Sequence, residues 1–288
     1  MATRLFVHCC IVSILLAGVA VPAIAQGARD LSEASEVRVY KNTDEADLKA
    51  YIYNPDDLAS GERRGAILFF HGGGWRSGNP DQFAPHCALL ASKGMIAITA
   101  EYRLTKKHGT PAWRCVEDAK SAMRWVRAHA ADLGIDPDRI AVGGGSAGGH
   151  LAACIGLGID GFDTDGEDSS VRVSGDAMVL FNPAVDIAQI PERYGWDGRN
   201  ADASPLQLVK PGAPPAIVFH GTADTTVPHD QAVAFTEAMT DAGNQCRLES
   251  TEDAGHGFFN FGRGDGSAYT DTTRSMVDFL EEHGFLDD

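Results

Sequence analysis

Short runs of apolar residues recur along the chain, and longer segments with a helical spacing of apolar positions separate them. A run that is apolar almost throughout, such as 66–70, is typical of a strand buried on both faces of a sheet. Residues 37–40 and 48–53 alternate enough to predict strands at one edge of that sheet. Further strands are predicted at 95–99, 177–181, 216–220 and 246–250.

Helices are predicted between most of these strands. They cover 82–92, a segment from just after Pro111 to residue 131, a segment that begins behind Ser146, 231–242 and 269–282. Alternating strands and helices predict an α/β fold with a mostly parallel central sheet and helices on both faces. In that architecture, functional groups gather at the carboxyl ends of the strands.

The helix after Pro111 is predicted to be amphipathic. Its core face is expected to comprise Val116, Ala119, Met123 and Val126. Its solvent face is expected to comprise Asp118, Lys120 and Arg124.

One stretch combines a strand end, several glycines and a single serine. Residues 140–145 run from apolar positions into glycines, and an Ala- and Leu-rich helical pattern follows Ser146. A strand that turns directly into a helix strains its corner residue, and small residues such as Gly144 and Gly148 let the two elements pass closely. Ser146 is predicted at that corner, as a nucleophile in front of a helix N-terminus. By itself, the motif also fits a glycine-rich turn that only connects or binds phosphate.

A serine nucleophile requires a base to take its proton and an acid to orient that base. Asp224 lies in the loop after the strand 216–220, and His256 lies between glycines after the strand 246–250. Both positions follow the carboxyl ends of predicted strands. We therefore predict a catalytic triad of Ser146, Asp224 and His256.

Other residues compete for these roles. His220 ends a strand and is interpreted as a structural hydrogen-bonding residue, and His150 as a packing residue on the helix behind the nucleophile. Asp253 is the main rival of Asp224 as the acid, but it lacks the context of a turn directly after a strand.

Attack on an ester carbonyl places negative charge on its oxygen, which backbone N–H groups can stabilise. Gly73 and Gly74 follow a buried strand and carry no side chains to obstruct a substrate, and Ala147 directly follows the nucleophile. The N–H groups of these three residues are the predicted oxyanion donors. His71 is interpreted as a residue that braces their loop.

Four motifs resemble those of α/β-hydrolase esterases of the hormone-sensitive-lipase-like group. They are HGGGW at 71–75, GGSAGG at 144–149, HGTADTTVP at 220–228 and AGHGF at 254–258. EYRL at 101–104 is similar to another motif of that family, DYRL, and the exported form with little lid is similar to bacterial feruloyl and acetyl-xylan esterases. The resemblance extends from residue 66 to the end, and it implies the α/β-hydrolase fold, the same triad and the same oxyanion donors.

Two departures from that family weaken an assignment to lipid substrates. Gly145 stands before the nucleophile where the lipase-like branch has Asp. The residues between 26 and 37 leave little room for the long N-terminal cap helices of that branch.

Residues 186–212 interrupt the strand-helix alternation and are expected to fold over the site as a small cap. Trp75, Tyr194 and Trp196 are candidate substrate-binding residues, which with Phe162 would form an aromatic wall that stacks on a sugar or a phenolic acyl group. The alternative is ordinary packing of the cap.

Charge narrows the choice of partners. The formal net charge of -16 argues against nucleic acid and anionic membranes, because both demand a basic surface. The acidic run 160–168 fails the spacing of an EF-hand loop and is interpreted as a solvated turn rather than a calcium site. Neither a metal nor an organic cofactor is implied.

The first residues have the pattern of an export signal at 1–25. Arg4 supplies positive charge, 5–21 is almost wholly apolar, and Ala23-Ile24-Ala25 is a cleavage pattern that predicts a mature chain starting near Gln26. The alternative is a membrane anchor, for which the apolar run is short. Residues 26–288 are expected to form one catalytic domain, secreted or periplasmic and without stable membrane insertion.

Six cysteines are present, and Cys9 and Cys10 lie within the predicted signal. Export permits disulfides among the others, and their spacing selects none of the three full pairings. These four residues are Cys87, Cys115, Cys154 and Cys246.

Together these patterns predict an exported serine carboxylesterase that hydrolyses short-chain or carbohydrate-linked acetyl or feruloyl esters through an acyl-enzyme. Its substrate would be a small-molecule or oligosaccharide ester. One alternative is a serine peptidase of the prolyl-oligopeptidase type, which shares the order of the triad. Another is a non-catalytic binding protein on a hydrolase scaffold, which requires Ser146 and His256 to be held apart.

Overall fold

The computed structural model describes residues 30–286, which contain one sheet of eight strands in the order β1-β2-β4-β3-β5-β6-β7-β8. The predicted signal at 1–25 lies outside these residues. The strands are β1 (Glu36–Asn42), β2 (Asp47–Tyr53), β3 (Arg64–Phe70), β4 (Ile96–Ala100), β5 (Ile135–Gly145), β6 (Ala177–Phe181), β7 (Ala216–Gly221) and β8 (Cys246–Thr251).

The sheet is parallel except at one edge. β1 pairs antiparallel with β2, and β2 pairs antiparallel with β4. All pairs from β4 across to β8 are parallel. The predicted α/β fold with a mostly parallel central sheet is therefore confirmed.

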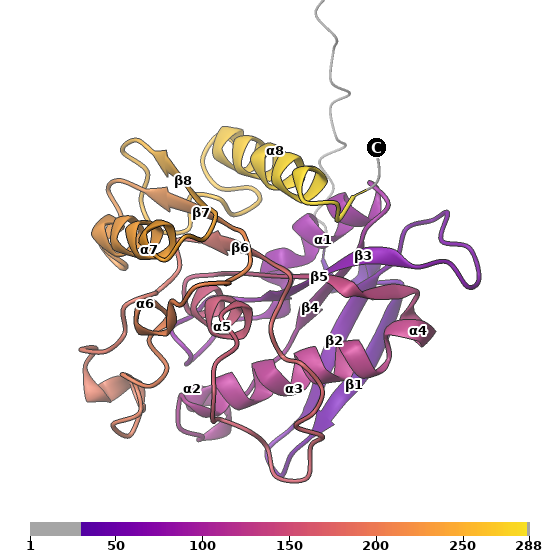
Figure 1. The fold of residues 1–288 in the computed structure, drawn as a ribbon, viewed down its shortest axis with the longest axis horizontal. Coiled ribbons are helices and arrows are strands. Elements are labelled where there is room, and N and C mark those ends of the chain that lie inside the picture. Colours follow the sequence, from indigo (N-terminus) through magenta and orange to yellow (C-terminus); the bar gives the residue numbers. More distant parts are fainter. Residues whose placement is uncertain (1–29, 287–288) are drawn as a thin grey trace, which may run out of the picture.

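Helices cover both faces of the sheet. Figure 1 shows α1 (Ala84–Ala91) and α8 (Ser267–Glu282) on one face and α3 (Arg114–Ala128), α5 (Ala147–Gly156) and α7 (His229–Asp241) on the other. The remaining helical elements are short. They are η1 (Leu31–Glu33), η2 (Pro80–Phe83), α2 (Thr105–His108), α4 (Ala130–Leu133), η3 (Glu192–Tyr194) and α6 (Pro205–Leu208).

Strand β3 shows why a central strand of this fold has a continuous apolar run, here from Ala66 to Phe70. Its alternate residues Ala66, Leu68 and Phe70 pack in the core under α3 and α5, whereas Ile67 and Phe69 pack in the core under α1 and α8. All five are fully buried. Because side chains alternate between the two faces, a strand covered on both faces has no position left for a polar residue.

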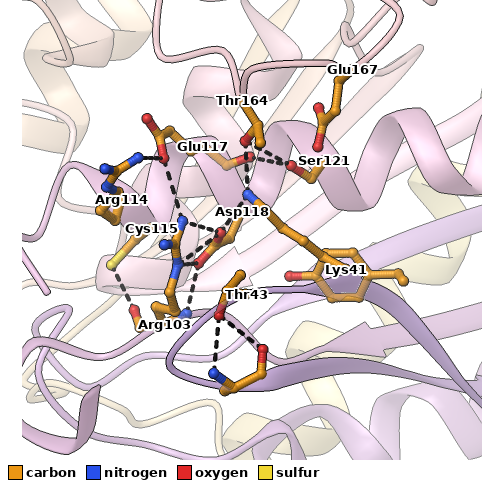
Figure 2. Close-up of polar contacts among 12 residues, drawn as sticks. Lys41, Thr43, Arg103, Arg114, Cys115, Glu117, Asp118, Ser121, Thr164 and Glu167 are labelled. Atoms are coloured by element: carbon orange, nitrogen blue, oxygen red, sulfur yellow. Dashed lines mark hydrogen bonds and ion pairs between the residues drawn. The ribbon is translucent and has the colours of Figure 1, made fainter. Parts of the chain in front are cut away.

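The expected solvent face of α3 is buried, which corrects the prediction from its sequence. Asp118, Lys120 and Arg124 are 0%, 2% and 8% exposed. Figure 2 shows Asp118 between two cations from other elements: Arg103 donates to both carboxylate oxygens, at 2.7 and 2.9 Å, and Lys41 of β1 donates at 2.8 Å. Charged groups tolerate burial when they are paired in this way.

The acidic run 160–168 pairs with the other two charged residues of this expected solvent face, Lys120 and Arg124. The Nζ atom of Lys120 lies 2.7 Å from a carboxylate oxygen of Asp163, and Arg124 pairs with Asp163 and, at 2.9 Å, with Glu167. These two carboxylates therefore serve as counter-charges for α3. Within residues 30–286, no group of three or more His, Cys, Asp or Glu side chains is arranged to hold a metal ion.

The four cysteines outside the predicted signal are free thiols in the structure. Cys87, Cys115 and Cys154 are buried, and Cys246 is partly exposed.

Candidate active site

Five loops meet at the edge of the sheet formed by the carboxyl ends of its parallel strands. The loop after β3 carries three consecutive glycines, and Ser146 directly follows β5. Asn182, Asp224 and His256 come from the loops after β6, β7 and β8. The topology therefore brings together residues that lie far apart along the chain.

Ser146 occupies the corner between β5 and α5. Its backbone has φ 55° and ψ -118°, a strained conformation for a residue other than glycine. A Cβ atom on Gly148 would lie 2.0 Å from the carbonyl oxygen of Phe70, so only glycine lets α5 start this close to β3. The glycine pattern in the sequence thus reflects a close approach of helix and sheet.

The structure brings Ser146, His256 and Asp224 into one hydrogen-bonded series. The Nδ1 atom of His256 lies 2.6 Å from Oδ2 of Asp224, and its Nε2 atom lies 2.9 Å from Oγ of Ser146. An ionised carboxylate can only accept, so Nδ1 carries the proton and Nε2 presents its lone pair to the serine hydroxyl. This arrangement suits the imidazole to take the proton of Ser146.

Asp224 is held in one orientation by its own loop. Its Oδ1 atom accepts hydrogen bonds from the backbone N–H groups of Thr226 at 2.8 Å and Val227 at 3.0 Å. Its side chain is 0% exposed. Two N–H donors and one imidazole N–H therefore stabilise a buried negative charge.

His220 lies beside the triad, with its Nε2 atom 3.4 Å from Oδ2 of Asp224, but the imidazole that contacts Ser146 is that of His256. The Nε2–H group of His220 donates to the carbonyl oxygen of Val227 at 2.9 Å, and burial lowers the pKa of His220, so the ring is a neutral structural residue. Asp253 is exposed, and Asp224 is the carboxylate that contacts His256.

The segments that carry the predicted oxyanion donors lie next to the nucleophile, and Gly73 lines the cavity at Ser146. A Cβ atom on Gly72 would lie 3.4 Å from Cβ of Ser146, so the loop that carries Gly73 and Gly74 runs directly beside the serine. Among the described residues, the N–H groups of Gly73, Gly74 and Ala147 donate to no backbone acceptor, as expected for Ala147 at the first position of α5. These N–H groups are therefore available to a substrate oxygen.

Tyr102 of the 101–104 motif supports this loop through His71. The hydroxyl of Tyr102 donates to the carbonyl oxygen of His71 at 2.7 Å, and the two rings stack at 4.3 Å between centroids. Burial lowers the pKa of His71 to about 4, so its ring is neutral. His71 thus packs beneath the glycines, as its sequence context predicts.

Three polar residues of the site were not predicted from the sequence. Gln82 accepts from the N–H of Gly72 at 2.6 Å and donates to Asn260 at 2.8 Å, and Asn182 accepts from the N–H of Gly257 at 3.0 Å. These contacts join the oxyanion loop, the end of β6 and the histidine loop. Asn182 follows a buried strand, so the strand-end rule could have found it; Gln82 and Asn260 carry no such signal.

The nucleophile opens into a cavity of 360 Å³. Its walls are Gly72, Gly73, Gly78, Asn79, Gln82, Ser146, Asn182, His256, Gly257, Phe259 and Asn260. This size is suited to a small organic ligand.

A larger cavity, of 630 Å³, lies at the other edge of the sheet. It is lined by Gly156 at the end of α5, by Asp176 before β6 and by Pro214 before β7. It therefore faces the amino ends of the strands and contains no residue of the Ser146 cavity.

The structure places none of the proposed aromatic wall in the lining of the cavity at Ser146, neither Trp75, Tyr194 and Trp196 nor Phe162. Trp75 and Trp196 are 4% and 1% exposed and pack edge-to-face against each other at 5.3 Å and against His150, to which Trp75 donates at 3.2 Å. Neither indole lines the cavity at Ser146. Tyr194 is half-buried, and its ring lies 3.9 Å from where a Cβ of Gly74 would be. Packing accounts for both indoles, and Tyr194, which packs against Trp75 at 5.9 Å, lies beside Gly74 without lining the cavity.

Comparison with known proteins gives consistent matches. Residues 51–239 match the BD-FAE family. The chain is 32% identical over 212 residues to Esterase LipQ of Mycobacterium tuberculosis, an alignment that covers 67% of this chain and 49% of LipQ. It is 31% identical over 216 residues to Carboxylesterase NlhH of the same species, covering 68% of this chain and 66% of NlhH. The chain thus spans about half of LipQ and slightly less than two thirds of NlhH.

Solved structures match over nearly their whole length. The chain is 47% identical to a thermophilic esterase from the Planctomycetes species Thermogutta terrifontis, solved with propionate bound, with a TM-score of 0.84 over 90% of this chain and 97% of that one. Esterase 2 of Thermogutta terrifontis phosphoramylated by tabun is also 47% identical, with a TM-score of 0.85 over 88% of this chain and 97% of that one.

Proposed function

The chain belongs to the BD-FAE family of α/β-hydrolase serine esterases, and we propose that it hydrolyses carboxylic esters through an acyl-enzyme formed on Ser146. The observation that carries this proposal is the continuous series from Ser146 Oγ through His256 to Asp224, with separations of 2.9 and 2.6 Å. A non-catalytic role would require the serine and the imidazole to be apart, so this contact favours catalysis.

The proton transfers follow from that geometry. As Ser146 Oγ attacks the ester carbonyl, Nε2 of His256 takes the hydroxyl proton, and Asp224 stabilises the imidazolium that forms. The imidazolium then donates the same proton to the leaving alcohol. Water repeats the cycle on the acyl-enzyme, which releases the acid and restores the serine.

The negative charge that develops on the carbonyl oxygen is assigned to the N–H groups of Gly73, Gly74 and Ala147. A preorganised donor at this position typically contributes about 10²- to 10³-fold to kcat, because it needs no reorganisation when the charge appears.

Short acyl chains are the preferred acyl groups in this proposal. The cavity at Ser146 measures 360 Å³, and the related Thermogutta terrifontis esterase was solved with propionate and with butyrate bound. Acetyl esters on carbohydrate alcohols fall within the same class. Feruloyl esters have less support, since Trp75 and Trp196 lie away from the cavity.

Substitutions of the triad test the reaction. Ser146→Ala is expected to abolish turnover of p-nitrophenyl acetate and labelling by a fluorophosphonate probe. Asp224→Asn is expected to lower kcat by about 10⁴-fold, because an amide favours the wrong imidazole tautomer. Asp253→Asn removes the same charge from an exposed position of the neighbouring loop and serves as the matched control. Wild-type turnover by Ser146→Ala would contradict the proposal.

An ester panel tests the substrate class. We expect p-nitrophenyl acetate, propionate and butyrate to be hydrolysed with higher kcat/KM than the octanoate, and acetylated xylan to release acetate. Preference for the octanoate, or turnover of an aminoacyl-proline anilide above that of the acetate, would favour a lipase or a peptidase instead.

Export is part of the same proposal. Its support is the pattern of an export signal at 1–25. Within residues 30–286, no helix is long and apolar enough to cross a membrane. Mass spectrometry of the full-length product expressed in a secretion-competent bacterium is expected to find a mature chain that starts at Gln26, outside the cytoplasm. A chain that keeps its first residues would contradict export.

A further inference from the structure

A second cavity, of 320 Å³, lies beside the oxyanion loop and is lined by cationic side chains. Its walls are Arg76, Ser77, Gly78, Leu104, Lys106 and Lys107. Arg76, Lys106 and Lys107 are exposed, and within residues 30–286 none of the three is part of an ion pair. Three unpaired cations therefore surround one hollow in a chain whose net charge is -16.

This cationic cavity adjoins the cavity at the nucleophile. Gly78 lines both. It packs so closely on the oxyanion loop that a Cβ atom on it would lie 2.2 Å from the carbonyl oxygen of Gly72, and a Cβ on Gly72 would lie 3.4 Å from Cβ of Ser146. A ligand bound at Ser146 therefore has to extend only past Gly78 to reach the cations.

Backbone hydrogen bonds fix the positions of the cation-bearing segments. The N–H groups of Arg76 and Ser77 both donate to the carbonyl oxygen of Gly73 at 3.1 Å. The N–H of Thr105, which precedes the two lysines, donates to the carbonyl oxygen of Trp75 at 3.0 Å. The loop that carries Arg76 and the segment that carries Lys106 and Lys107 are thus joined to the loop that holds the predicted oxyanion donors.

The field of these cations reaches the oxyanion loop. Burial is the main cause of the low pKa of His71, and the positive charge of Lys107 lowers it further. An anionic group placed in the cationic cavity would experience the same field with the favourable sign.

We propose that the cationic cavity binds a carboxylate on the alcohol portion of the ester, so that the preferred substrates are short-chain esters of acidic alcohols. This inference rests on the proposed function. A short acyl group fits the cavity at Ser146 and is too small to extend past Gly78, which leaves the alcohol portion to carry the anion.

Two acetyl esters of equal shape test this inference. 4-Acetoxybenzoate carries the carboxylate, and 4-acetoxybenzamide is its neutral counterpart. The ratio of their kcat/KM values is expected to fall about tenfold in Lys106→Gln/Lys107→Gln, since each exposed ion pair contributes a few-fold. Arg76→Gln is expected to lower the ratio further when it is added to that double variant.

The control removes the same charge elsewhere. Lys93→Gln/Lys210→Gln changes two exposed lysines outside both cavities and is expected to keep the wild-type ratio. The wild-type ratio should also shrink when the salt concentration rises from about 0.05 M to about 0.5 M, because salt screens exposed charges. An unaltered ratio in Lys106→Gln/Lys107→Gln, or an equal fall in the control, would overturn the inference.

A binding measurement separates this inference from the proposed function. Calorimetric titration with the product 4-hydroxybenzoate, compared with 4-hydroxybenzamide, requires no turnover. We expect the Kd for 4-hydroxybenzoate to rise about tenfold in Lys106→Gln/Lys107→Gln but not in the control. If the wild-type chain hydrolyses neither ester, the esterase proposal fails. The inference is overturned separately if the Kd for 4-hydroxybenzoate is the same in Lys106→Gln/Lys107→Gln and in the control Lys93→Gln/Lys210→Gln.

Discussion

The side-chain oxygen of Asn182 accepts a hydrogen bond from the backbone N–H of Gly257 at 3.0 Å, which connects the end of β6 to the loop that carries His256. Asn182 is 1% exposed, and its own N–H donates to the carbonyl oxygen of Phe219 at 2.7 Å. Its φ of 35° lies in a region that Asn tolerates better than most residues. Asn182 is therefore placed to fix the imidazole through the backbone of the adjacent residue.

Asn182→Ala is expected to lower kcat for p-nitrophenyl acetate about 10- to 100-fold, because a small misplacement of a reacting group carries a cost of that size. KM should change much less. Asn182→Asp keeps the acceptor oxygen and should retain more activity. Steady-state kinetics measure kcat, and thermal unfolding measures the fraction of folded protein. If the loss of folded protein accounts for the whole fall in activity, Asn182 has no positioning role.

Gly73→Ala is expected to reduce kcat/KM by about 10²-fold or more, because it displaces the proposed oxyanion donors. The new Cβ atom would lie 1.9 Å from the carbonyl oxygen of Ser77, and φ at this position is 122°. Gly61→Ala is the matched control, since Gly61 also has positive φ, of 83°, but no atom within 4 Å of the new methyl group. Equal activity of the two variants would contradict the assignment.

Arg103→Met is expected to lower the free energy of unfolding by about 3 kcal/mol, because it leaves the buried Asp118 with too little counter-charge. Lys41 remains as the other cation at that carboxylate. Urea unfolding at neutral pH measures the change. Arg274→Met breaks an exposed ion pair with Asp271 and should cost less than about 1 kcal/mol. Similar losses of unfolding free energy in the two variants would contradict a larger contribution of the buried ion pair.

The burial of His86 leads us to expect a loss of stability in acid. Burial lowers its pKa from 6.5 to about 3, and neither ring nitrogen has a hydrogen-bond partner among the described residues. Between pH 6.5 and about 3, His86 is therefore protonated in the unfolded chain but neutral in the folded chain. The free energy of unfolding falls as the pH drops through this range.

Relative to the wild-type chain, His86→Phe is expected to change the free energy of unfolding by about 2 kcal/mol more in favour of the folded state at pH 5 than at pH 8. Phe suits the site because the ring of His86 packs against Phe83 and Phe181. Urea unfolding at the two pH values measures the difference, and the exposed His129→Gln serves as the control. Equal pH dependence in His86→Phe and in the wild-type chain would contradict the prediction.

Much of the fold was predictable from local sequence. The apolar run at 66–70 predicted a strand buried on both faces. The structure confirms this, since every residue of β3 except its first is buried. The corner at Ser146 was predictable from its glycines, since backbone sterics involve close neighbours. The meeting of Ser146, Asp224 and His256 at one edge follows from the parallel order of the strands that precede them.

Contacts between distant segments decided the rest. The sequence predicted that Asp118, Lys120 and Arg124 face solvent, but only packing showed that β1 and the loop 160–168 cover these side chains. Likewise, Trp75 has the sequence context of a cavity wall, yet Trp196 and His150 enclose it.

The sequence by itself therefore determined the strand-helix order, the corner at Ser146 and the strand ends on which Asp224 and His256 lie. Periodicity and backbone sterics depend on residues close in the chain, so a single sequence records them. Only the tertiary structure decided which charges are buried and that Asn182 contacts Gly257, 75 positions away. Those outcomes depend on which distant segment covers a surface, and no local pattern encodes that choice.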